Sequence, residues 1–418
     1  FPVGYPFLGQ VILHDATPTA TTPLAADHPR PLNLASIYGR RPSALYCSRD
    51  PDRLRVGLTR ARETSIGIAP TGSSDDLPRT SASGDDGWGS EALIADRRNC
   101  DNLVLAQLHV AFLKFHNAVL ERARASGADG QGAFADAARV VIWHFQWIIL
   151  NDFLRRLIAP DIFERFSPHG SPAARAARRD AAPAELAAAA FRVGHASARS
   201  SYDVNAIFCT SGRGPASLEQ LRRLTAGNGR SGPLASKWVV DWRRFFALAA
   251  DPMPQPSRRF DPFIVPALHA VSADGALPKL DLVSGYSLAL PSGQDIARRL
   301  GLKPLPTDVL AAGDDGATAA RHGMHRSTPL LYYLLKEAQH CGGEHLGPVG
   351  SFIFAIALFG LIEGDAASFR RSPEPWAPTL PSATPGRFDM ADLLHLAAVG
   401  ELAPEQSRSQ PRPAGTRD

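Results

Sequence analysis

Apolar residues recur every three or four positions over long parts of the chain. In segment 101–125, Leu105, Leu108 and Phe112 fall on one face while charged residues lie off it, which predicts an amphipathic helix. Segment 134–158 is almost continuously apolar and is predicted as a buried helix. Shorter helices are predicted over 184–200, 294–300, 330–339 and 349–361. Stretches with strand-like alternation are short and few, so the predicted fold class is mainly α.

Segment 57–92 has a different character, because it is dense in Gly, Ser, Thr, Asp and Pro and has little periodicity. It is interpreted as a long irregular insertion. Two Pro-rich connections, 252–266 and 372–385, are interpreted as surface crossings and not as linkers between domains. We expect a single domain over 1–403 and a disordered basic tail over 404–418.

Composition and charge exclude several classes of protein. The 418 residues include 45 Lys or Arg and 41 Asp or Glu, which gives a formal net charge of +4. This small excess is spread along the chain, so no nucleic-acid partner is expected. The four cysteines lie far apart without a C-x-x-C spacing, which indicates neither a zinc module nor a disulfide framework.

The N-terminal residues FPVGYPFLGQ carry no basic flank, sustained apolar core or small-residue cleavage site, so no signal peptide is expected. The sequence does not begin with Met, which suggests a trimmed start. The longest apolar run, Ser351 to Ile362, is shorter than the roughly 20 residues that cross a bilayer, so no transmembrane segment is expected. A cytoplasmic location is compatible with these features, and the sequence does not indicate an oligomeric state.

Five histidines are candidates for chemistry. His109, His116 and His144 lie in apolar helical segments, where a backbone carbonyl usually satisfies the ring, and they are assigned no role. His14 is different because Asp15 follows it and Gln10 lies one turn upstream if the segment is helical.

His195 directly follows Gly194, which would let a large planar group approach the backbone. Arg192 lies three residues earlier, on the same face of a helix. One imidazole and one guanidinium on one face are what a haem site requires, because haem offers an iron and two carboxylates.

Six segments, in this order along the chain, together resemble the animal-type haem peroxidases of the peroxidase-cyclooxygenase superfamily, in particular its bacterial members. These segments are GQVILHDAT, LNLASIYG, ADRRNCDNLVLAQLHVAFLKFHNAVLERA, AFRVGHASARSSYDVN, LDLVSGYSLALPSGQDIA and TPLLYYLLKEAQHCGGEHLGPVGSFIFAIALFGLIEGD. The resemblance implies a mainly α, animal haem peroxidase-like domain with few short strands.

The resemblance also implies roles for individual residues. His195 is the expected axial ligand of the haem iron, and Arg192 the partner of a haem propionate. His14 is the expected distal acid-base group, Arg98 its cationic companion, and Gln10 a side chain that orders a distal water or halide. An imidazole that titrates near neutrality suits proton transfer to and from peroxide, and a guanidinium stabilises the negative charge that develops as the O–O bond breaks.

Departures from the family pattern bear on the cofactor. Asp281 stands where the family generally has an asparagine that supports the proximal histidine, so a lower reduction potential is expected. Leu13 and Asn102 replace two residues that bind haem covalently in mammalian members, and Asp101 replaces a longer glutamate. We therefore expect haem b, bound without a covalent link or with at most one through Asp101, and little ability to oxidise chloride.

The family's calcium site includes the aspartate after the distal histidine, which is Asp15 in this chain. The matching loop has Pro29, Asn33 and Ala35 at the positions of ligand side chains. Calcium takes six to eight oxygen ligands, and this loop lacks several of the family's ligand side chains, so no tightly bound calcium is expected. Asp15 and Asn33 are the remaining candidate ligands.

The leading hypothesis is a haem-dependent peroxidase that reduces hydrogen peroxide and oxidises small aromatic or phenolic donors, with iodide or bromide as further donors and a place in the response to oxidative stress. A fatty-acid dioxygenase or cyclooxygenase is the first alternative. Those relatives have a tyrosine three residues before the proximal histidine, where this chain has Arg192, although Tyr202 or Tyr46 could act from elsewhere. A haem-binding scaffold with little turnover is the second alternative, and retention of His14, Arg98 and His195 argues against it.

Overall fold

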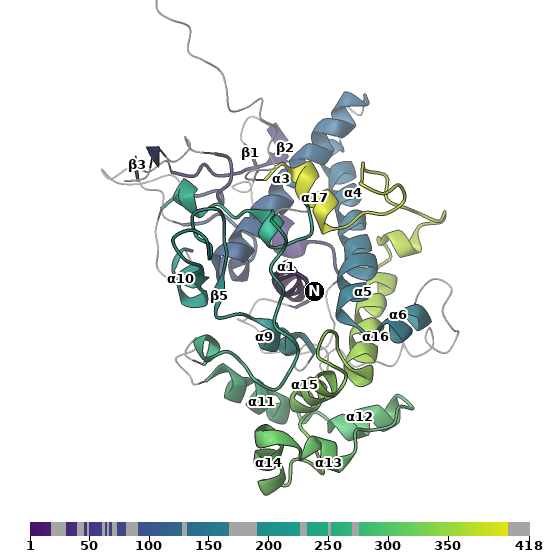
Figure 1. Ribbon diagram of the computed structural model, residues 1–418. Helices are drawn as coiled ribbons and strands as arrows, with labels where there is room; N and C mark the ends of the chain where they lie inside the picture. The colour runs from purple at the N-terminus through teal and green to yellow at the C-terminus, as the bar shows by residue number, and fades with distance from the viewer. Residues whose placement is uncertain are drawn as a thin grey trace, which may run out of the picture.

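The computed structural model describes thirteen stretches of the chain. They are 1–17, 31–39, 46–47, 50–60, 63–64, 67–68, 73–80, 91–127, 132–166, 190–225, 232–249, 252–269 and 276–399. Within these stretches the protein is mainly helical, with a few two-residue to five-residue strands, so the predicted fold class is confirmed (Figure 1). The three strand pairs, β1–β2, β3–β4 and β5–β6, are all antiparallel.

The described elements follow one another along the chain in three parts. The first part contains α1 (Gly4–Ala16), α2 (Ala35–Tyr38), β1 (Tyr46–Cys47), β2 (Asp50–Leu54), β3 (Glu63–Thr64), β4 (Gly67–Ile68), η2 (Arg97–Cys100), α3 (Leu103–Ala125) and α4 (Ala133–Ile148). The middle part contains η3 (Ile149–Phe153), α5 (Leu154–Leu157), α6 (Pro160–Phe166), η5 (Phe191–Val193), α9 (Gly194–Ser197), β5 (Ser201–Tyr202), β6 (Ala216–Ser217), α10 (Leu218–Arg223), η7 (Ser236–Trp238), η8 (Trp242–Arg244) and η9 (Pro266–Leu268). The last part contains α11 (Leu277–Ser287), α12 (Gly293–Arg299), α13 (Thr307–Leu310), α14 (Gly313–Arg321), α15 (Leu330–His340), α16 (Pro348–Gly364), η10 (Phe369–Arg371) and α17 (Met390–Ala397).

Helix α3 packs against both α4 and α17 (Figure 1). It starts at Asn102, whose side chain accepts a hydrogen bond from the backbone N–H of Leu105 and so caps the first turn. Its apolar face packs on α4, where the rings of Phe112 and Phe145 meet edge to face with centroids 5.5 Å apart. The periodicity of segment 101–125 therefore predicts this helix correctly.

The helix predicted over 134–158 contains a π turn, η3, at Ile149–Phe153. The wider turn brings Phe153 against α1, where its ring lies so close to Gly9 that a Cβ there would be 3.3 Å from it. Such turns inside helices are frequent at functional sites, and apolar periodicity does not reveal them.

The helix predicted over 184–200 is only partly described. Its described part is a 3₁₀ turn followed by the short helix α9, which ends at Ser197 and not at residue 200. The end is fixed locally, since the Ser197 hydroxyl donates to the carbonyl oxygen of Gly194 and Ala198 takes an extended conformation.

The described parts of segment 57–92 form short pairings and not a wholly irregular loop. Gly57 pairs with Asp76, and a Cβ at Gly57 would lie 2.1 Å from the carbonyl oxygen of Leu77, so only glycine fits. Arg60 pairs with Ala235, which ties the segment to the middle of the chain. The domain boundary at residue 403 stays a prediction, and 404–418 lie outside the described residues.

Two stretches, Leu103–Ala125 and Ala133–Leu157, are long and apolar enough to cross a membrane by length and composition. The apolar part of the first is mostly buried inside the protein, which is typical of a core helix.

Helix α1 crosses the centre of the described fold and contacts α3, α9, η2, η3 and η5 (Figure 1). Its start is fixed at Gly4, whose N–H donates to the carbonyl oxygen of Phe245 over 2.9 Å. A Cβ at Gly4 would lie 2.4 Å from the ring of Phe246 and 2.7 Å from that carbonyl oxygen. The missing side chain is therefore what lets α1 approach this region so closely.

Gly4→Ala is expected to lower the free energy of unfolding by about 1–3 kcal/mol, because the added methyl group overpacks this contact. Denaturant unfolding monitored by circular dichroism measures the change. Gly364→Ala is the matched control, since nothing lies within 4 Å of a Cβ at this last residue of α16. Equal stability of the Gly4 variant and the unchanged protein would show that α1 is not held by this contact.

Candidate active site

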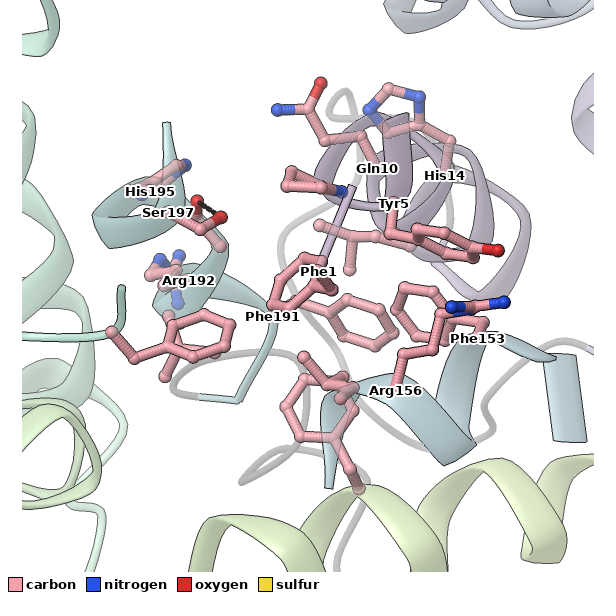
Figure 2. A pocket seen from close by; sticks show the side chains of 18 of the residues that line it. Phe1, Tyr5, Gln10, His14, Phe153, Arg156, Phe191, Arg192, His195 and Ser197 are labelled. Carbon is pink, nitrogen blue, oxygen red and sulfur yellow. Dashed lines mark hydrogen bonds between the residues drawn. The ribbon is translucent and has the colours of Figure 1, made fainter. Parts of the chain in front are cut away.

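A cavity between α1 and α9 brings together candidate residues that are far apart in sequence. Figure 2 shows His195 and Arg192 on one wall and Gln10 and His14 on the other. Arg98, from η2, also lines the cavity. Between the polar walls the lining is largely apolar and aromatic, with Tyr5, Phe153, Phe191, Phe260 and Phe354 among its residues.

His195 is oriented by a buried carboxylate. Its Nδ1 donates to Oδ2 of Asp281 over 2.8 Å, and Asp281 is 4% exposed. Within the described part of the chain, Nε2 has no hydrogen-bond partner and is the nitrogen left for a ligand. A Cβ at Gly194 would meet nothing within 4 Å, so the space beside the backbone at this position is open. A histidine whose Nδ1–H is held by a carboxylate and whose Nε2 is available fits the axial ligand of a haem iron.

Asp281 is shared between two partners. Its Oδ1 accepts from Nε of Arg192 over 3.0 Å while Oδ2 accepts from His195. Asp281 is the one buried residue of α11, so the helix delivers this single side chain into the site. The positive charge of Arg192 offsets the carboxylate and weakens its pull on the proton of His195. Sequence reasoning assigned Arg192 to a haem propionate and did not foresee this ion pair.

His14 and Gln10 share one face of α1, four residues apart, and both line the cavity. Burial lowers the pKa of His14 below its ordinary value of 6.5, and the charge of Arg98 acts in the same direction. The hydrogen bond between His14 Nδ1 and Asn99 Oδ1, at 2.8 Å, opposes this shift in pKa without cancelling it. The imidazole is therefore neutral at pH 7 and able to accept a proton.

Arg98 is held firmly at the end of α1. Its guanidinium pairs with Asp96 at 2.6 Å, donates to the carbonyl oxygens of His14 and Thr17, and donates through Nη1 to the hydroxyl of Thr17. Burial alone would raise the pKa of Asp96, but the hydrogen bonds and charge of Arg98 outweigh it and hold that pKa below the ordinary value. Of the two Nη1 hydrogens, one finds a partner among the described residues, which leaves the other as a donor.

The positions linked to covalent haem attachment differ in their placement. Leu13 lines the cavity. Asp101 is exposed and is not among the residues that line it. Asn102 uses its side chain to cap α3. None of these positions presents a buried carboxylate to the cavity.

Asp15, a candidate calcium ligand, is hydrogen-bonded to the backbone of the turn at residues 33–36. Its carboxylate is fully buried and accepts hydrogen bonds from the backbone N–H groups of Leu34, at 2.8 Å, and Ser36, at 3.0 Å. These bonds hold Leu34 at φ 58°, a left-handed conformation that is rare for leucine. Asn33 accepts from the N–H of Ala35 in the same turn. The part of the chain that the structure describes contains no cluster of three or more His, Cys, Asp or Glu side chains that could hold a metal ion.

Asp15 makes stability depend on pH. Burial raises its pKa from 3.8 to about 6, although the backbone hydrogen bonds of Ser36 and Leu34 oppose the shift. The folded state therefore binds this proton more tightly than the unfolded state, so the stabilisation is full below about pH 4 and lost as the pH rises past about 6. Between about pH 4 and pH 6, the free energy of unfolding of the unchanged protein should fall by about 2–3 kcal/mol more than that of Asp15→Asn. Urea titrations at several pH values measure it, and parallel pH profiles of the two proteins would contradict it.

Sequence reasoning missed four side chains next to the distal residues: Thr17, Asp96, Asn99 and His109. Asp96 and Asn99 flank Arg98, so their place in the chain was a usable signal. His109 was assigned no role, yet its Nδ1 accepts a hydrogen bond from Asn99 at 3.3 Å. His116 and His144 do bond to carbonyl oxygens, of Asp52 and Val140 respectively.

Comparisons with known proteins bear on the family and the fold of this chain. Residues 32–228 match the family model of animal haem peroxidase. Peroxidase A from Dictyostelium discoideum is similar over 90% of this chain and 80% of its own, with a TM-score of 0.54 and 15% identity. Fatty acid alpha-dioxygenase from Oryza sativa is similar over 88% of this chain and 69% of its own, with a TM-score of 0.53 and 12% identity.

A variant of that Oryza sativa enzyme with palmitic acid gives a TM-score of 0.53 at 14% identity, over 88% of this chain and 69% of its own. No curated protein matches the sequence. At these identities the structural likeness shows the fold, while the family match rests on the sequence of residues 32–228. Residues 32–228 therefore match the animal haem peroxidase family, and the described chain has the fold of these peroxidase and dioxygenase structures.

Proposed function

We propose that the protein is a haem b peroxidase that reduces hydrogen peroxide and oxidises small aromatic or phenolic donors. The observation that carries this proposal is the pairing of two imidazoles across one cavity. One is neutral and partly buried, as a general base requires, and the other has Nδ1 tied to a carboxylate and Nε2 available.

The residues of this chain divide the work between the two walls. His14 accepts a proton from peroxide and returns it to the departing oxygen, for which a neutral imidazole in hydrogen-bond reach is suited. Arg98, fixed by Asp96 and the end of α1, offers a donor to the developing negative charge. Gln10, one turn from His14, orders water or a halide beside it. Haem, when bound, supplies the redox-active iron that takes two oxidising equivalents from peroxide and passes them to donors singly.

Binding of haem without a covalent link is supported by three side chains. Leu13 cannot form an ester, Asn102 is engaged in capping α3, and Asp101 is exposed outside the cavity lining. His195 would hold the iron, and Arg192 would pair with a propionate while it also binds Asp281.

Aromatic donors are favoured by the lining of the cavity. The rings of Phe153, Phe191, Phe260 and Phe354 face it together with Tyr5, and aromatic pairs add stabilisation beyond burial of area. Iodide and bromide remain further proposed donors, which would approach Gln10 and Arg98.

A fatty-acid dioxygenase is the alternative. The fold does not distinguish it from a peroxidase, because the similar peroxidase and dioxygenase structures have TM-scores of 0.54 and 0.53. Position 192 is arginine, which favours the peroxidase. Tyr202 is buried against Phe7 and is not among the cavity lining residues, while the side chain of Tyr46 lies outside the described residues. Tyr5 does line the cavity, but its hydroxyl donates to the carboxylate of Asp152.

The proposed function predicts a Soret band for the haem-loaded protein that is lost in His195→Ala. His14→Gln should keep the band but lower the rate of peroxide reduction about 10²- to 10⁴-fold, because the general base is gone. His116→Gln is a matched control, since this buried histidine binds Tyr38 and Asp52 away from the cavity. Because His14 has a lowered pKa, the rate should fall on acidification with a midpoint below 6.5, the ordinary pKa of histidine.

Two results would overturn the proposed function. The first is a Soret band unchanged in His195→Ala. The second is brisk oxygen uptake with linoleate together with slow oxidation of phenols, which would favour the dioxygenase.

The ion pair at the proximal wall predicts opposite shifts of the reduction potential. Asp281→Asn should raise the potential, because a neutral amide draws less on the proton of His195. Arg192→Gln should lower it, because the carboxylate then loses its second partner. Potentiometry of the haem-loaded variants measures both shifts. An unchanged or lower potential in Asp281→Asn would remove Asp281 from this role.

A further inference from the structure

Asn99 lies where three helices meet. It is fully buried in η2, between Arg98 and Cys100. Its Oδ1 lies 2.8 Å from Nδ1 of His14 on α1. Its Nδ2 lies 3.1 Å from the carbonyl oxygen of Ser36 on α2 and 3.3 Å from Nδ1 of His109 on α3.

The orientation of this amide follows from its partners. The carbonyl oxygen of Ser36 only accepts, so the atom of Asn99 that faces it must be the NH₂ group. The amide oxygen is then directed at His14, and an amide oxygen also only accepts. Nδ1 of His14 must therefore carry a hydrogen. In the neutral ring this leaves the lone pair on Nε2.

His109 supports the same orientation from the other side. The ring is 1% exposed, and burial lowers its pKa to about 4, so it is neutral at pH 7. Its Nδ1 accepts the second amide hydrogen of Asn99, which places its own hydrogen on Nε2. The two histidines therefore hold opposite tautomers, with the same amide between them.

We propose that Asn99 is the positioning residue for His14, and that it fixes the Nδ1–H tautomer so that the Nε2 lone pair is available to the cavity. The carbonyl oxygen of Ser36 and the ring of His109 keep the amide from turning over. The tautomer follows from the structure alone, and its catalytic meaning rests on the proposed function.

The effect matters because a neutral imidazole in water favours the other tautomer, with its hydrogen on Nε2. Asn99 is not among the cavity lining residues, so Nδ1 points away from the cavity and Nε2 is the nitrogen left to face it. The charged groups around His14 are Arg98 on η2, Asp96 just before it and Asp101 just after it, with Arg192 and His195 across the cavity. Among the described residues, Asn99 is the side chain that bonds to Nδ1 of His14.

Nitrogen NMR of the full haem-free chain, labelled with ¹⁵N at histidine, tests this proposal without any turnover. At a pH above the histidine range, His14 should show the ¹⁵N shifts of the Nδ1–H tautomer and His109 those of the Nε2–H tautomer. His14→Gln and His109→Gln assign the two resonance pairs. In Asn99→Leu, the His14 ring should change to the Nε2–H tautomer.

Asn117→Leu is the matched control. Asn117 is also a buried asparagine, and its amide makes two hydrogen bonds of 2.9 Å with the backbone of Leu54. Asn117→Leu should lower the free energy of unfolding by about as much as Asn99→Leu does and leave the tautomer of His14 unchanged. In the haem-loaded protein, Asn99→Leu should reduce peroxide more slowly than Asn117→Leu by about 10- to 100-fold, with the Soret band retained.

An Nε2–H tautomer of His14 in the unchanged protein would overturn the proposal, and so would a tautomer that is the same in Asn99→Leu. If Asn99→Leu does not fold, the tautomers of the unchanged protein decide alone. The tautomers are measured without haem, so this test is separate from that of the proposed function. The expected tautomers in a protein without peroxidase activity would support the role of Asn99 and contradict the proposed function.

Discussion

Both imidazoles that face the cavity are tied through Nδ1 to a buried oxygen, and the chemistry of the site depends on this constraint. His195 is tied to a carboxylate, Asp281, at 2.8 Å, and His14 to an amide, Asn99, at the same distance. A charged acceptor makes the ring a stronger donor to a metal, while His14, which bonds to a neutral amide, is uncharged at pH 7 because burial lowers its pKa. In the proposed function, this difference in acceptor separates the iron ligand, His195, from the proton carrier, His14.

The cations of the site are balanced by carboxylates of the protein itself. Arg98 is paired with Asp96, and Arg192 with Asp281. Pairing fixes each guanidinium in place before any ligand arrives, which is what preorganised electrostatic stabilisation requires. Asp15 plays a comparable part for the backbone, since it binds the loop that carries Ser36, and Ser36 in turn holds Asn99. The wall of the cavity that carries His14 is therefore supported by one connected set of buried and partly buried hydrogen bonds.

The sequence predicted the parts of the fold that rest on local periodicity, and the family resemblance pointed to residues that the structure brings to one cavity. Helices α3, α15 and α16 lie where the apolar pattern predicts them. The π turn at Ile149–Phe153 and the early end of α9 depend on local hydrogen bonds that periodicity does not encode. Asn99 and His109 were missed for a related reason: the bond from Asn99 to His14 joins residues 85 apart, and a buried histidine is more often structural than functional.

Resonance Raman spectroscopy of the ferrous, haem-loaded protein tests the central claim most directly, because the iron–histidine stretch reports the ligand and the strength of the hydrogen bond on its Nδ1. The stretch should be present, should disappear in His195→Gly and should return when imidazole is added. A stretch that persists in His195→Gly would contradict the assignment of the proximal wall and with it the separation of roles between the two histidines.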